Sequence, residues 1–442
     1  MKIECLGLAF IYMSDFKPST RSTFLREFNY LSDWQHIFDF WRKDLLAGVT
    51  VGVVALPLAL GFAITTGAPA SVGLVTAIIA GFIAALFGGS NFQVTGPTGA
   101  MTVVLVPIVV NYGLSSLAII GVGAGLLIII MSLIRAGNLI DSVPISVMEG
   151  FTLGIAVIIA LQQIPLIFEV DKASGSHTLE VALKTTQSAL SGGINWVSVS
   201  LVVMTLLVKF TWPKLRTKFK YLSFIPASIV AVVILSVVSE LFNLSVNRIG
   251  ELPRTLELKF DFDLGEVPIS GLIYAIIAVA LLGAIESLLS ARVADGMARK
   301  EIDHEQIKHQ PNKELFGQGL ATMASALSGG LPATGAIART SVNVRSGART
   351  RLAAIIHAGF LLLVVLFLAP LVGHIPTAVL AGVLLGTSIR IASPRSIREA
   401  LTTTKSEAVI YLITAISVIA IDLIWGILIG MVAHKVLNQK IS

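Results

Sequence analysis

The sequence predicts an all-α polytopic membrane protein with about 14 transmembrane segments, arranged as a 7+7 inverted repeat. The 442 residues are 55% hydrophobic and only 13% charged, whereas a typical soluble domain carries roughly 25% charged residues. Apolar runs of about 18 residues recur along the chain, and a helix of that length crosses a hydrocarbon layer of roughly 30 Å. We therefore expect the chain to fold in lipid.

The apolar runs fall into two series of seven, one in each half of the chain. An odd number of spans per half means that two related halves enter the membrane in opposite directions, as in many secondary transporters. We expect a cytoplasmic N-terminal segment at 1–43, a first repeat at 44–241, an extracellular linker at 242–266 and a second repeat at 267–442. The expected spans are 45–66, 69–88, 97–111, 115–134, 144–168, 194–211 and 222–241, then 267–291, 314–329, 332–344, 351–372, 375–389, 406–420 and 422–438.

Charged residues agree with this topology. Basic side chains gather in the links that an intracellular N-terminus would place in the cytoplasm, as the positive-inside rule requires. The first apolar run begins only at about Leu45, so we expect no cleavable signal peptide, and we expect both termini on the cytoplasmic side of the cell (inner) membrane. Residues 31–43 are expected to form an interfacial helix, and the links 169–193 and 242–266 to form solvated outer loops.

Composition and spacing exclude several classes of function. Cys5 is the only cysteine, so the chain has neither an internal disulfide nor a redox pair. The net charge of +6 lies in the links between spans, which argues against nucleic-acid binding. His304 and His309 are five residues apart and lie on different helix faces, so we expect no zinc site. We find no nucleophile triad and no phosphate loop, and we predict no metal, no cofactor and no enzyme activity.

One pair of segments is similar between the two halves. Proline and glycine just before an apolar run predict that spans 3 and 10 begin as short half-helices inside the membrane. Two such N-termini, each with about half a positive charge, would face each other near Thr98 and Gly335 and hold a small anion. The alternative is close helix packing by small residues, which we expect at Gly121 and Gly125. The paired motifs are Leu86-Phe87-Gly88-Gly89 with Thr98-Gly99-Ala100, and Leu327-Ser328-Gly329-Gly330 with Thr334-Gly335-Ala336.

Three further polar residues belong to this expected site. Arg339 follows within the second short helix and would add a full positive charge behind the anion; the alternative is an arginine that snorkels to the cytoplasmic face. Glu286 lies deep in an apolar run, with Ser290 one turn further on the same face. A carboxyl in a low-dielectric environment either carries a proton or pairs with a cation, so both are candidate coupling residues. A structural ion pair is the alternative.

Four motifs resemble the sulfate permease (SulP) family of anion transporters, and the resemblance runs from about Asp44 to the end of the chain. They are ALPLALGFA at 55–63, TGPTGAMT at 95–102, NKELFGQG at 312–319 and NVRSGART at 343–350. The resemblance implies a fourteen-span fold of a core and a gate domain, elevator-like alternating access and a homodimer. Most members continue into a cytoplasmic STAS domain, which we expect to be absent from this chain, either naturally or by truncation.

The resemblance also implies a set of site residues. By position, Thr98, Gly99 and Ala100 match anion contacts in the third span, Gly335 and Ala336 match those in the tenth, Phe62 matches a wall of the site, and Arg339 matches an adjacent arginine.

The coupling ion and the transported substrate cannot be copied from any one relative. Sodium-coupled bicarbonate members have Asp at the position of Glu286 and Thr at the position of Ile337. Ile337 offers no side-chain oxygen, so a proton is favoured over sodium. We expect secondary active transport of a small inorganic anion such as sulfate or bicarbonate, by symport or exchange. A dicarboxylate or nucleobase transporter of the same fold, and an uncoupled anion channel, are the alternatives.

Overall fold

The computed structural model describes residues 28 and 34 and the ranges 37–175, 177–216, 225–255, 268–302 and 308–439. Contacts divide the chain into Met1–His36 and Ile37–Ser442, and the description below concerns the second unit. The interfacial helix expected at 31–43 lies largely outside the described residues. Within them, residues 37–40 form turns and the first long helix begins at Trp41.

Helices account for both expected series of apolar runs. In the first half they are α4 (Trp41–Thr66), α5 (Ala70–Phe87), α6 (Gly99–Tyr112), α7 (Ser116–Leu133), α8 (Ile145–Gln162) with α9 (Ile164–Phe168), α11 (Trp196–Arg216) and α12 (Ala227–Leu241). In the second half they are α13 (Ile269–Ile302), α14 (Pro311–Leu327), α15 (Ile337–Arg345), α16 (Leu352–Gly373), α17 (Thr377–Ile391), α19 (Lys405–Ala420) and α20 (Leu423–Gln439).

The largest difference in length is at α13, which continues about three turns beyond the expected end near residue 291. Good helix formers follow there, and Ala294 and Ala298 are fully buried. Packing and propensity therefore extend this helix after its apolar run has ended.

Among the described residues, the α-helices α10 (Thr178–Gly192) and α18 (Pro394–Thr402) lie outside the apolar runs. α10 lies in the link 169–193, so the expectation of a loop there is wrong for these residues. Ala182, Thr185 and Ala189 are buried at helical spacing on one face of α10. An amphipathic helix needs only such a stripe, which a search for long apolar runs overlooks.

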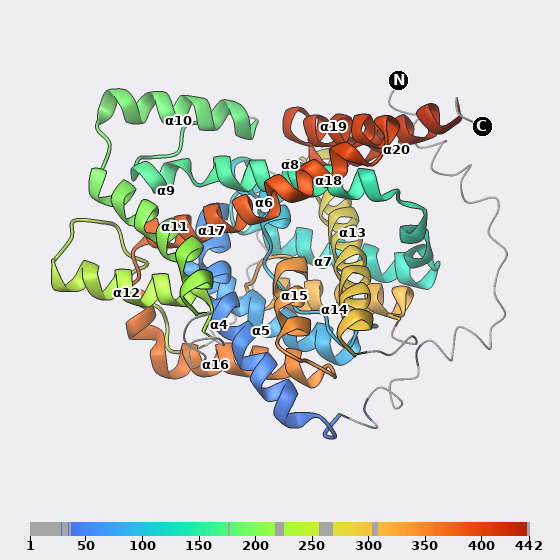
Figure 1. Cartoon of the computed structure of the whole chain (residues 1–442), viewed down its shortest axis with the longest axis horizontal. Coiled ribbons are helices and arrows are strands. Elements are labelled where there is room, and N and C mark those ends of the chain that lie inside the picture. Colours follow the sequence, from blue (N-terminus) through green and yellow to red (C-terminus); the bar gives the residue numbers. More distant parts are fainter. Residues whose placement is uncertain are drawn as a thin grey trace. The chain divides into compact units, whose positions relative to one another are not determined.

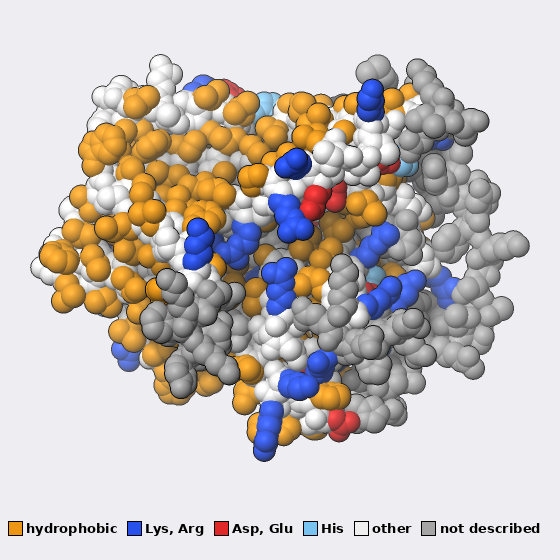
Figure 2. Space-filling view, viewed as in Figure 1, with side chains coloured by type: hydrophobic (Ala, Val, Ile, Leu, Met, Phe, Trp, Pro, Cys, Tyr) orange, Lys and Arg blue, Asp and Glu red, His pale blue; other side chains and the backbone are white. Residues whose placement is uncertain are grey.

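Apolar side chains remain exposed over much of the described surface. Within the described residues, seven helices are long and apolar enough to cross a membrane, and α6, α12, α17 and α20 are shorter apolar helices. Phe367 is 72% exposed and Leu207 is 58% exposed, and in water each such side chain would cost about 25 cal/mol for every Å² left exposed. Figure 2 shows hydrophobic side chains over a large part of the visible face. The fold is that of a polytopic membrane protein.

The spans pack into two groups, which we call the core group and the gate group. The core group contains α4 to α7 and α13 to α16; the gate group contains α8, α9, α11, α12, α17, α19 and α20. Figure 1 shows α15 of the core group beside α13, and α8, α19 and α20 of the gate group together. Each half of the chain thus contributes its earlier long helices to the core group and its later ones to the gate group.

Small residues allow the core helices to approach closely. A methyl group added to Gly121 would lie 2.5 Å from Cβ of Ala326, and one added to Gly125 would lie 2.6 Å from the carbonyl oxygen of Gly319. The close packing expected at both glycines is confirmed, because α14 contacts α7 at both positions, through the Cβ of Ala326 at Gly121 and through backbone at Gly125.

We predict that Gly125→Ala destabilises the protein, because the obstructing oxygen belongs to the backbone of α14 and cannot rotate away. Overpacking of this kind typically costs about 1–3 kcal/mol. Thermal unfolding in detergent should show a lower midpoint for Gly125→Ala. The matched control is Gly359→Ala in α16, where an added methyl meets nothing within 4 Å; its midpoint should be unchanged or higher. Equal midpoints for the two variants would contradict this packing.

Candidate functional site

A two-stranded antiparallel ladder joins the two halves of the chain at the starts of α6 and α15. The strands are β1 (Thr95–Gly96) and β2 (Thr334–Gly335), with Thr95 opposite Gly335 and Gly96 opposite Thr334. α6 begins three residues after β1, and α15 begins two residues after β2. The ladder therefore brings the N-termini of two helices from opposite halves of the chain together.

Both helices are short, and their first turns carry backbone N–H groups that have no acceptor within the helix. α6 has 14 residues and α15 has 9, which correspond to about 21 Å and 14 Å of helix. Thr98 caps α6, since its Oγ1 accepts the N–H of Met101 at 3.2 Å. Ala336 at the N-cap of α15 has no side-chain cap. Aligned peptide dipoles make both helix starts favourable for an anion.

A carboxylate lies between the two helix starts. Oε2 of Glu286 accepts the hydroxyl of Thr98 at 2.8 Å and the hydroxyl of Thr334 at 2.6 Å. The two threonine oxygens are themselves 3.0 Å apart. Glu286, on α13, is partly exposed, whereas both threonines are buried. One acidic side chain thus links three separate segments at the point where the ladder ends.

Arg339 packs against the backbone of β1 and is only 1% exposed. Its Nη2 donates to the carbonyl of Pro97 at 3.0 Å, and a methyl added to Gly96 would lie 2.6 Å from its Nη1. Nη1 has no hydrogen-bond partner among the described residues. The snorkelling alternative is therefore wrong, because the guanidinium is buried against the ladder.

The remaining residues predicted from sequence separate into two sets. Phe62, Gly99, Ala100, Gly335 and Ala336 lie at the two helix starts or against them; a methyl added to Gly99 would be 3.1 Å from the ring of Phe62. Ser290 lies elsewhere.

Ser290 contacts α15 and not the carboxylate. Its hydroxyl donates to Oγ1 of Thr340 at 3.1 Å, and the same Oγ1 accepts the N–H of Val94 at 3.1 Å. Ser290 therefore joins α13 to α15 one turn away from Glu286, and Thr340 joins α15 to Val94, the residue before β1.

Two side chains of the site were absent from the predicted set. Thr334 contacts both Glu286 and Thr98, and its position in the repeated Thr-Gly-Ala motif was a usable signal. Ser287 accepts the N–H of Gly335 at 2.9 Å through its hydroxyl. No periodicity marks Ser287, because Gly283, Ala284 and Ala291, one helical turn away on α13, are small and not polar.

The residues that pair in the ladder are not the residues that are similar between the two halves. The similarity aligns Thr98-Gly99 with Thr334-Gly335, whereas the ladder pairs β2 with Thr95-Gly96, three residues earlier. Two Thr-Gly pairs lie close together in the first half, and only backbone hydrogen bonding selects between them.

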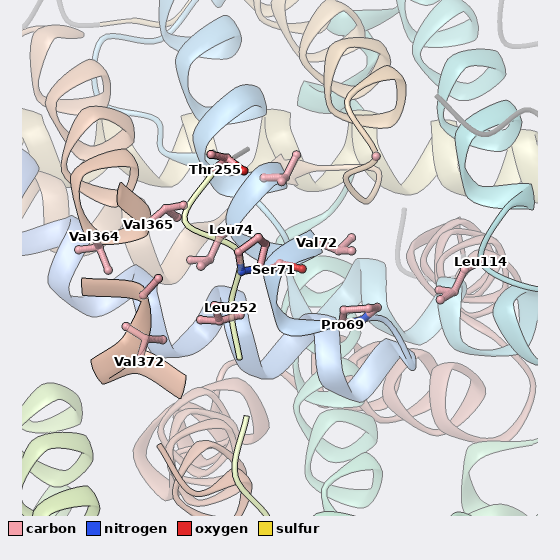
Figure 3. Close-up of a pocket in the computed structure, with 14 residues that line it drawn as sticks. Pro69, Ser71, Val72, Leu74, Leu114, Leu252, Thr255, Val364, Val365 and Val372 are labelled. Atoms are coloured by element: carbon pink, nitrogen blue, oxygen red, sulfur yellow. The ribbon is translucent and has the colours of Figure 1, made fainter. Parts of the chain in front are cut away.

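Two cavities lie away from this site. One, of about 230 Å³, is lined mostly by apolar side chains of α5, α16 and the linker at Leu252 (Figure 3). Such a lining offers an anion few partners. A second, of about 310 Å³, lies between α6 and α13 of the core group and α20 of the gate group, and includes Asn111, Tyr274 and Asp422. The described residues contain no cluster of three or more His, Cys, Asp or Glu side chains suited to a metal.

Comparison with known proteins relates this architecture to anion transporters. The model of the sulfate permease family matches residues 41–414. The chain is 35% identical over 404 residues to a putative sulfate transporter, YvdB, of Bacillus subtilis (strain 168), covering 88% of this chain and 72% of the relative. It is 31% identical to the bicarbonate transporter BicA of Picosynechococcus sp., covering 90% of this chain and 70% of the relative. The solved transmembrane domain of a cyanobacterial BicA superposes with a TM-score of 0.76 at 31% identity, covering 89% of this chain and 97% of that domain.

Proposed function

Since this chain belongs to the sulfate permease family, whose matched relatives are transporters and not enzymes, we propose that it is a secondary active transporter of a small inorganic anion of the sulfate or bicarbonate type. The observation that carries the proposal is the pairing of β1 with β2, which sets two helix N-termini around one point. Relatives named as sulfate and bicarbonate transporters support the substrate class.

The anion binds where the first turns of α6 and α15 meet. The residues at these helix starts are small: Gly99 has no side chain, and Ala100 and Ala336 have only a methyl group. Backbone N–H groups can therefore approach a ligand closely. Arg339 supplies a full positive charge behind β1 through a guanidinium that keeps one nitrogen unpartnered by the described residues. Dipoles, N–H groups and charge all favour a compact anion over a neutral solute.

Glu286 makes binding depend on a second ion. Two unit charges about 4 Å apart repel by about 4 kcal/mol at an effective dielectric of about 20, which is roughly a thousandfold in affinity. An ionised Glu286 between the helix starts would oppose the anion to that extent. A proton on the carboxyl removes the repulsion, so anion and proton bind together and move together. Ile337 at the start of α15 has no oxygen for sodium.

The two helix groups supply the moving parts of the carrier. The core group holds the site and slides against the gate group in an elevator-like cycle, and α6 and α15 are half-helices that begin near the bilayer midplane. The cavity between α6, α13 and α20 forms part of the route by which the anion reaches the site when the two groups move apart. The whole chain forms a 7+7 inverted repeat of about 14 spans, with both termini in the cytoplasm and two copies in a dimer in the cell membrane.

We predict that Glu286→Gln abolishes the stimulation of anion uptake by an inward proton gradient, because the amide mimics the neutral carboxyl but cannot exchange a proton. Proteoliposome uptake of labelled sulfate or bicarbonate, measured with and without the gradient, checks this. Glu149→Gln on α8, an exposed acid in the gate group, is the matched control and should keep the stimulation. Full proton stimulation in Glu286→Gln, or uptake driven by sodium alone, would refute proton coupling through this residue.

Thr98→Val should raise the KM for the anion roughly tenfold, since it removes the cap of α6 and one of the hydroxyls that hold Glu286. Thr102→Val is the control: Thr102 is equally buried, but its hydroxyl bonds only the backbone carbonyl of Thr98 among the described contacts. Uptake kinetics should leave Thr102→Val within about twofold of the parent protein. Equal effects in both variants would show that the helix start has no special role.

A substrate panel separates the carrier from the alternatives of the same fold. Uptake should saturate with anion concentration and be inhibited by excess sulfate or bicarbonate, because the site is built for a compact anion. Inhibition by fumarate or uracil alone would assign a dicarboxylate or nucleobase substrate. Electrical current that grows without saturation would assign an uncoupled channel.

A further inference from the structure

Gly335 is held from two directions, one of which involves a buried glutamine. On one side the hydroxyl of Ser287 accepts the N–H of Gly335 at 2.9 Å. On the other side, a methyl built on Gly335 would lie 2.0 Å from Nε2 of Gln93, a distance at which atoms overlap. The side chain of Gln93 is therefore packed directly against Cα of Gly335, and its own exposure is 6%.

Glu314 determines where the Gln93 amide lies. Nε2 of Gln93 donates to Oε1 of Glu314 at 2.6 Å. The other carboxylate oxygen accepts the N–H groups of Gly89 at 2.8 Å and Ser90 at 3.0 Å. Glu314 is 1% exposed, so these three donors satisfy a charge that water cannot reach. Oε1 of Gln93 has no partner within the described part of the chain, which leaves the bond to Glu314 to fix the amide.

Close backbone contact makes this arrangement rigid. A methyl added to Gly317 would lie 2.4 Å from the backbone nitrogen of Gly88, and one added to Gly89 would lie 2.2 Å from the carbonyl oxygen of Gln310. The first turns of α14 therefore press against the segment that leads into β1. This part of the chain contains the Asn312–Gly319 motif. None of the motif's side chains was placed at the anion site above.

We propose that Gln93 and Glu314 are positioning residues for the anion site. Glu314 holds Gln93, and Gln93 presses Gly335 against Ser287, so that the first turn of α15 meets the first turn of α6 at the distance the anion requires. The inference rests on the proposed transport function. Neither side chain touches the anion, and both act through the backbone of β2.

The contact between Gly335 and Gln93 can be tested with a double mutant, by measuring uptake of labelled sulfate or bicarbonate into proteoliposomes. The three atoms nearest to a methyl at Gly335 all belong to the side chain of Gln93. Gly335→Ala should therefore reduce Vmax/KM at least tenfold because it collides with the amide. In the Gln93→Ala background the methyl has space, so Gln93→Ala/Gly335→Ala should transport at least as well as Gln93→Ala alone. If the two losses multiply instead, the proposed packing role of Gln93 is wrong.

Two further variants address the bond to Glu314 and guard against misfolding. Gln93→Met keeps the volume against Gly335 but cannot donate to Glu314, and it should raise KM several-fold with little change in Vmax. An unchanged KM would overturn the role of Glu314. Gln163→Leu, which removes an equally buried glutamine of the gate group, should leave KM unchanged.

Size-exclusion chromatography in detergent restricts the comparison to variants that remain folded. If Gln93→Ala does not remain folded, the KM of Gln93→Met alone tests the proposal. Saturable uptake by the parent protein separates a failure of this inference from a failure of the transport proposal.

Discussion

The short ladder between β1 and β2 is the contact on which the rest of the site depends. Gly96 and Thr334 are paired although more than 200 residues separate them in the chain. Only a few backbone hydrogen bonds are formed, but they lie where both helices begin. Any shift of one strand along the other would move a helix start, the threonine that follows it and the approach to Glu286 together. The polar side chains that bind the backbone beside the ladder keep the two strands in this register.

The cost of burying polar groups explains how that register is kept. The backbone beside the ladder is bound mainly by side chains of α13, α14 and α15. Ser287 binds Gly335, Thr340 binds Val94, and Gln318 donates to the carbonyl of Ala333 at 2.6 Å. In a low-dielectric interior each bond would leave an expensive unsatisfied group if it were broken. Non-helical backbone in a membrane protein is tolerated where protein, and not lipid, surrounds it.

Groups of opposite charge lie close together at the candidate site. Two helix starts and Arg339 favour an anion, while Glu286 between Thr98 and Thr334 opposes one. A site with only the first set of charges would bind an anion and retain it. In the transport mechanism that we propose, the carboxyl makes anion affinity depend on a second ion, and this dependence couples the two fluxes. That proposal gives a reason for an acidic residue among groups that would otherwise serve only anion binding.

The sequence by itself determined the membrane fold, most helix ends and the residues of the two helix starts, because hydrophobic length, proline and glycine act locally. Glu286 and Arg339 were recognisable because an ionisable residue in an apolar run is expensive. The tertiary structure alone decided that Thr95-Gly96 and not Thr98-Gly99 pairs with β2, that Ser287 and Gln93 hold Gly335, and that α10 is a helix. These features depend on contacts between segments distant in sequence or on a narrow buried stripe, and neither leaves a long apolar run in the chain.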